Sequence, residues 1–246
     1  MSDEEALQKQ FEKLAECETA MAKVDKEVEQ FRIDKSAALF NQRRDIVREM
    51  PKFWYIALAE HEDFVDLIAM EDLKFLEDVK DIYVDYQDVD HFTITFEFDG
   101  ELVPKQTVTK KFTVTTEDGE DKITSEAVAI EWPEELKEIN PKLIKEAKGA
   151  DLSKEDKANY RTGMRSLFAW FDWTGEKPGK EFREGDELAR VLANDIYVNA
   201  VKYYTVALQD DGEDVEVDSS EGEELDLEDD DDDDDDEQPK KKQKTE

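Results

Sequence analysis

The stretch EEALQKQFEKLAECETAMAKVDKEVEQFRIDKSAALFNQRRDIVRE, residues 4–49, decides the fold of this chain. It contains no Gly or Pro; Ser2 and Glu5 match a capping box at its start, and Pro51 follows its end. A capping box starts a helix, and Pro cannot continue one. The sequence therefore predicts one helix over residues 4–49, about 70 Å long at 1.5 Å per residue.

Apolar residues recur along this helix mostly at steps of three, four and seven, with one slip at Val24, as in a coiled coil. A body made of the roughly 160 residues that follow would be about 40 Å across, too small to cover the whole stripe. We therefore expect a second copy of the chain to cover it in a homodimer. The predicted dimerisation residues are Leu7, Phe11, Leu14, Met21, Val24, Val28, Phe31 and Leu39, with Ile46 ending the stripe.

Beyond residue 50 the sequence predicts an α+β domain, an antiparallel β-meander packed with helices. The clearest strand is 91–98, where four apolar residues alternate with polar ones. Further strands are expected at 82–86, 107–116 and 123–132. Helices are expected from Pro51 to about residue 68, at 71–78, from Asn140-Pro141, at 154–172 and at 186–208 with a break near Asn199, and residues 174–185 are expected to form a charged loop.

The charge is very uneven along the chain. The formal net charge is −35; residues 210–237 carry −20, the last nine residues carry +3, and residues 1–209 therefore carry −18. Such a field repels nucleic acid and anionic membranes and attracts basic proteins such as histones, although solubility alone could also explain it. We predict four segments: 1–50 a dimerisation helix, 51–208 an α+β domain, 209–238 a disordered acidic tail, and 239–246 a basic end.

Signals for other classes of protein are missing from the sequence. One cysteine, Cys17, cannot form an intramolecular disulfide, and no apolar run could span a bilayer, so we expect a soluble intracellular protein. His61 and His91 do not form a metal-ligand set with it. The loop at 175–181 does not match a phosphate loop, and Asp210-Asp211-Gly212 is not an EF-hand. We expect no catalytic residues, no cofactor and no metal.

The order of these elements resembles the NAP/SET family of histone chaperones. The motifs that carry the resemblance are Arg43-Arg44-Asp-Ile46, Pro51-Lys-Phe-Trp54, His61, Glu71-Asp72-Leu73, Phe92–Phe98, Ser125, Ile130-Glu-Trp132, Leu167–Phe171, Asp186-Glu-Leu188, Asp195-Ile-Tyr197 and Tyr203-Tyr204. Segments 124–133, 139–144, 160–164 and above all FDWTGEKPGKEF at 171–182 are similar to the fungal SET-like branch, which partners a histone H3 acetyltransferase. The animal Ile-Trp-Pro pattern reads Ile196-Tyr-Val198 here, which also favours the fungal branch.

The resemblance implies a non-enzymatic homodimer whose two long helices pair and whose acidic underside binds core histones, H3–H4 foremost and also the histone 2A and 2B pair. Glu184, Asp186, Glu187, Asp195, Asp210 and Asp211 are the candidate histone-binding residues. The resemblance also implies stimulation of a partner histone H3 lysine acetyltransferase. The alternative is an acidic enzyme regulator, a phosphatase inhibitor or a DNA mimic, without a role in histone deposition.

Two basic segments stand apart from the acidic composition. Lys240, Lys241, Lys242 and Lys244 resemble a nuclear localisation signal, which predicts a nuclear protein with some in the cytoplasm; a chance basic end is the alternative. Lys177, Lys180 and Arg183 form a basic loop that could dock an enzyme, with structural or phosphate-facing roles equally open. No sequence-specific binding of nucleic acid is expected.

Overall fold

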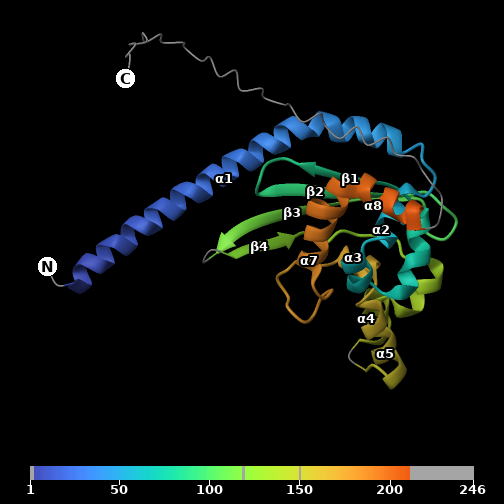
Figure 1. Cartoon of the computed structure of the whole chain (residues 1–246). Helices are drawn as coiled ribbons and strands as arrows, with labels where there is room; N and C mark the ends of the chain where they lie inside the picture. Colours follow the sequence, from blue (N-terminus) through green and yellow to red (C-terminus); the bar gives the residue numbers. More distant parts are fainter. Residues whose placement is uncertain (1–2, 118–119, 150, 211–246) are drawn as a thin grey trace, which may run out of the picture. The chain divides into compact units, whose positions relative to one another are not determined.

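The computed structural model describes residues 3–117, 120–149 and 151–210. The chain begins with α1 (Asp3–Val47), one helix of 45 residues, drawn in blue in Figure 1. The predicted long N-terminal helix is thus confirmed, although it ends two residues earlier than expected. A turn follows in which Lys52 has a φ of 57°. This left-handed backbone at Lys52 separates α1 from the next helix.

Four strands form one antiparallel sheet in sequence order, and Figure 1 shows them as a meander. They are β1 (Val79–Tyr86), β2 (His91–Phe98), β3 (Gln106–Glu117) and β4 (Glu120–Ser125). The register pairs Phe92 with Phe112 and Phe96 with Val108, so the apolar alternation of both strands falls on one buried face. The predicted α+β meander is confirmed.

The core lies against this apolar face and is rich in aromatic rings. It takes side chains from α2 (Phe53–Ala59), α3 (Glu62–Leu67), α6 (Leu167–Trp170), α7 (Gly185–Arg190), the π-helix η3 (Val191–Ile196) and α8 (Tyr197–Asp210). The ring centroids of Phe112 and Trp170 are 5.5 Å apart, and those of Trp132 and Phe168 are 5.8 Å apart. Trp132 and the aromatic residues at 167–173 are all buried in this core.

The remaining four helices are short. They are the 3₁₀ helices η1 (Met70–Asp78) and η2 (Glu134–Ile139), followed by α4 (Pro141–Lys148) and α5 (Lys154–Gly163). The predicted helices at 71–78 and from Asn140-Pro141 are confirmed. The predicted break near Asn199 is also confirmed, since Asn199 has a non-helical φ of −102° within α8.

Two predicted helices are wrong because side chains interrupt each of them. The helix expected from Pro51 is α2 and α3, separated where the buried His61 accepts a hydrogen bond at Nδ1 from the Phe64 N–H and caps α3. The helix expected at 154–172 is α5 and α6. Asp72 accepts hydrogen bonds from the Ser166 hydroxyl and the Leu167 N–H, at 3.0 and 2.6 Å, and these fix a new helix start at residue 167.

The strand expected at 123–132 is also shorter than predicted. β4 ends at Ser125 because the following residues bond to the loop that carries residues 171–174 instead of to β3. The Val128 N–H donates to the Phe171 carbonyl at 2.9 Å, and the Ser125 N–H donates to the Thr174 carbonyl at 3.0 Å. Periodicity alone cannot distinguish such an extended segment from a strand.

Candidate functional site

One face of α1 carries large apolar side chains that nothing in the described part of the chain covers. All eight predicted dimerisation residues are between 56 and 63% exposed, and Ile46 is 66% exposed. Single exposed apolar residues are normal, but a continuous exposed row marks an interaction surface. The structure therefore shows that the domain leaves this stripe uncovered, whereas the identity of the covering partner remains a prediction.

A second apolar row on α1 faces the domain, and the sequence analysis missed it. Ile33 and Val47 are 5 and 3% exposed, and between them Phe40 packs on Tyr197 with ring centroids 5.1 Å apart. These three residues recur every seven positions, which is the signal that could have revealed a second row.

Arginines fasten the C-terminal part of α1 to the sheet. Arg44 and Arg48 form ion pairs with the buried carboxylate of Asp81 at 2.5 and 2.8 Å, and Arg48 also pairs with Glu97 at 2.8 Å. Arg43 donates to the carbonyls of Tyr197 and Val198. The same helix thus presents one apolar face outward and fixes the domain with the other.

Three of the predicted histone-binding residues share one exposed turn at the start of α7. Glu184, Asp186 and Glu187 are all exposed, and Glu184 forms an ion pair with Arg183 at 2.9 Å. Asp186 and Glu187 have no hydrogen bond or ion pair from their side chains to any other described residue.

Buried side chains of the core fix the turn that holds these carboxylates. Glu184 has a φ of 57°, and a Cβ added to Gly185 would lie 2.5 Å from the indole of Trp173. The indole N–H of Trp170 donates to the Gly185 carbonyl at 2.9 Å. Only Gly allows this close approach, so two buried Trp residues fix where the acidic turn stands.

Asp195, the fourth candidate, lies about 12 Å further along the helical stretch and has partners of its own. Its carboxylate accepts from Asn199 and Tyr203 at 2.8 Å each and contacts Nε2 of His61 at 3.2 Å. Partial burial would raise the pKa of Asp195, but these three hydrogen bonds outweigh it and lower the pKa below its ordinary value. Its side chain is still 44% exposed, so it can both join α3 to α8 and meet a ligand.

The structure adds acidic residues that the sequence analysis did not select. Glu62, Asp63 and Asp66 of α3 are exposed, and α3 packs against η3, which carries Asp195. The charge of Asp63 acts on Tyr203 together with that of Asp195, and burial with these charges raises the pKa of Tyr203 to about 12. His61 caps the N-terminus of α3, and the acidic residues that follow it in the sequence are the local signal from which this acidic helix could have been predicted.

The other predicted site residues lie outside the described residues. Asp211 and the four lysines Lys240, Lys241, Lys242 and Lys244 belong to that part of the chain, as does the side chain of Asp210. Their roles stay predictions, as do the four segment boundaries.

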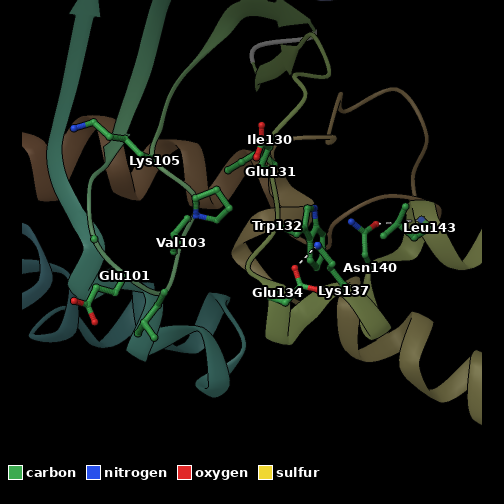
Figure 2. A pocket seen from close by; sticks show the side chains of 13 residues that line it. Glu101, Val103, Lys105, Ile130, Glu131, Trp132, Glu134, Lys137, Asn140 and Leu143 are labelled. Carbon is green, nitrogen blue, oxygen red and sulfur yellow. Dashed lines mark hydrogen bonds and ion pairs between the residues drawn. The ribbon is translucent and has the colours of Figure 1, made fainter.

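A pocket of about 450 Å³ between the loop at 100–105 and residues 130–143 was a candidate for a small-molecule site. Figure 2 shows Trp132 between Val103 on one side and Asn140 and Leu143 on the other, with the ion pair of Lys137 and Glu134 drawn as a dashed line. Asn140 is occupied as the N-cap of α4. The lining residues supply no nucleophile beside a base, and they do not suggest a reaction.

Within residues 3–117, 120–149 and 151–210, no three His, Cys, Asp or Glu side chains gather to hold a metal ion. No helix in the same ranges has the length and apolar character needed to cross a bilayer. His91 is exposed and contacts Asp88 at 2.8 Å, as expected for a solvated residue.

Comparison with known proteins gives consistent results across nearly the whole described region. The family model described as nucleosome assembly protein (NAP) matches residues 3–207. Vacuolar protein sorting-associated protein 75 of Saccharomyces cerevisiae is 40% identical over 233 residues, 90% of this chain and 86% of that protein. The crystal structure of the Vps75 histone chaperone matches with a TM-score of 0.72 and 38% identity, covering 82% of this chain and 99% of that one. The crystal structure of Ccp1 matches with a TM-score of 0.63 and 28% identity, covering 82% and 97%.

Proposed function

Because the chain belongs to the nucleosome assembly protein family, we propose that it is a histone chaperone that acts as a homodimer and catalyses no reaction itself. The observation that carries this proposal is the likeness, over four-fifths of the chain, to the solved structure of the Vps75 histone chaperone. The exposed stripe on α1 supports the dimer, since a partner helix would cover it.

The histone-binding surface that we propose consists of the acidic turn Glu184, Asp186 and Glu187 together with Asp195 and the exposed carboxylates of α3. Core histones are strongly basic, so this acidic surface attracts them. The carboxylates of Asp186 and Glu187 have no partner among the described residues, so they need not break an ion pair first. H3–H4 is the foremost ligand, and the histone 2A and 2B pair is a second one. Residues 210–237, with a charge of −20, add attraction that acts at long range and is screened by salt.

We test the acidic turn by neutralising it. Glu184→Gln, Asp186→Asn and Glu187→Gln are combined, and each histone pair is titrated against the full-length dimer at several salt concentrations. Exposed ion pairs contribute about 0.5 kcal/mol each, so the triple variant is expected to raise the Kd roughly tenfold. The matched control neutralises three exposed carboxylates elsewhere: Glu138→Gln, Glu146→Gln and Glu155→Gln.

Equal affinity of the two triple variants would show that the turn is not the histone surface. Equal binding of histones and of an unrelated basic protein would favour the alternative function, an acidic enzyme regulator such as a phosphatase inhibitor or DNA mimic. The same proposal places the protein in the nucleus, where its ligands are.

Stimulation of a histone H3 lysine acetyltransferase is the second part of the proposal. A dimer that holds H3–H4 off DNA and also binds the enzyme raises the effective concentration of substrate without new chemistry. The assay measures labelled acetyl transfer to H3–H4 with enzyme, chaperone or both. Transfer by the chaperone alone would contradict the non-enzymatic proposal, and equal rates with and without chaperone would remove the cofactor role.

A further inference from the structure

One part of this acidic domain is basic. Residues 141–183 contain ten Lys and Arg against seven Asp and Glu, whereas residues 1–209 as a whole carry −18. This segment comprises α4, α5, α6 and the loop that follows α6.

Four of these lysines surround one small pocket of about 290 Å³. We call it the lysine pocket: its lysines are Lys142, Lys145, Lys177 and Lys180, and its apolar lining is Ala127, Pro141, Tyr160, Met164, Ala169 and Phe182. The Nζ of Lys145 stands 4.8 Å from the centroid of the Tyr160 ring, which holds that cation at the rim.

The four lysines outnumber the two carboxylates, Asp172 and Glu181, that also line the pocket. Among the described residues, no carboxylate oxygen lies within 4 Å of the Nζ of any of the four lysines. Glu181 is already bound by the Thr174 N–H at 2.7 Å, the Thr174 hydroxyl at 2.9 Å and the Lys177 N–H at 2.8 Å. Burial raises the pKa of Asp172, although the positive charges of Lys142 and Lys110 act in the opposite direction. An incoming anion would therefore find free partners.

We propose that the lysine pocket binds an acidic peptide segment of a partner protein that inserts one apolar side chain between the lysines. The apolar lining and the small volume suit a side chain, and the lysines at the rim suit flanking Asp or Glu. A long polynucleotide fits less well, because the acidic surface outside the pocket repels a continuous row of phosphates. This surface differs from the acidic turn, and the proposal does not depend on histone binding.

The experiment uses the full chain and a fluorescent twelve-residue peptide that carries Glu on both sides of a single Leu. Lys142→Glu with Lys145→Glu, and Lys177→Glu with Lys180→Glu, are measured separately and together by fluorescence anisotropy. The matched control, Lys154→Glu with Lys157→Glu, reverses two exposed lysines of α5 that do not line the pocket. Thermal unfolding identifies any variant that fails to fold.

Each pocket double variant is expected to weaken binding about tenfold, and the control about twofold through the general field. A peptide with Ser in place of Leu should bind at least fivefold more weakly to the wild type. Equal loss in the control variant, equal binding of the Ser peptide, or equal binding of a single-stranded oligonucleotide of the same charge would overturn the proposal.

Discussion

Val24→Asp combined with Phe31→Asp tests whether a second copy of α1 covers the exposed stripe. Burying a whole Val or Phe side chain stabilises by about 1.5–3 kcal/mol. Val24 is 56% exposed and Phe31 is 63% exposed, so covering the exposed part contributes about 1–2 kcal/mol for each residue. A symmetric dimer contains each residue twice, and the double variant therefore loses about 6 kcal/mol, or about four orders of magnitude in Kd. A buried carboxylate would add to this loss.

Sedimentation equilibrium measures the outcome at micromolar concentration. The wild type is expected at twice 28.6 kDa and the variant at 28.6 kDa. The matched control, Thr19→Asp with Ala37→Asp, adds the same charge at exposed positions on the other side of the helix and should remain a dimer. A wild-type mass of 28.6 kDa, or a variant that still sediments as a dimer, would refute the assignment of this stripe to the interface.

Further predictions concern stability, salt and localisation. Lys110→Met should lower the free energy of unfolding by about 1–3 kcal/mol in denaturant titrations, because buried Lys110 donates to three main-chain carbonyls. Burial raises the pKa of Asp72 to about 6, so folded Asp72 binds a proton more tightly than unfolded Asp72. As the pH falls from 6 to 4, the free energy of unfolding of the wild type should therefore rise by up to about 3 kcal/mol relative to that of Asp72→Asn. Deleting residues 210–246 should weaken histone binding and flatten its salt dependence without abolishing it; complete loss would exclude the folded surface as the main site. A fusion lacking residues 239–244 should lose nuclear accumulation under the microscope, and retained accumulation would indicate another import route.

The elements with a strong repeating pattern were predictable from the sequence. The alternation in residues 91–98 located β2 to the residue, and the uninterrupted residues 4–49 located α1. In both cases the pattern is local, since each side chain reports the face on which it lies.

Elements determined by contacts between distant residues were not predictable in the same way. The start of α6 depends on Asp72, ninety-four residues before Ser166, and no periodicity reports that contact. Lys110 shows the same limit. The strand that contains it was predicted, but its complete burial depends on carbonyls of Glu126, Phe171 and Trp173, which come from two later segments.

The candidate site was predictable only as individual carboxylates. The composition indicated an acidic surface, but 68 Asp and Glu make any single choice weak. What distinguishes Asp186 and Glu187 is the turn beneath them, where Gly185 packs on Trp173 and accepts a hydrogen bond from Trp170. That support involves residues 12 to 15 positions earlier and becomes visible only in the folded chain.

The ion pairs at the base of α1 connect the two halves of the proposed function. Asp81 is almost completely buried, and its two arginine partners, Arg44 and Arg48, come from the helix that we propose as the dimer axis. A buried carboxylate that loses its partners is strongly destabilising, so α1 cannot swing away from β1 without a large cost. Dimerisation through α1 would therefore fix the direction in which each sheet, and with it each acidic turn, faces. Two acidic turns held in a constant relation can bind one histone complex together, which is a stronger arrangement than two independent acidic surfaces.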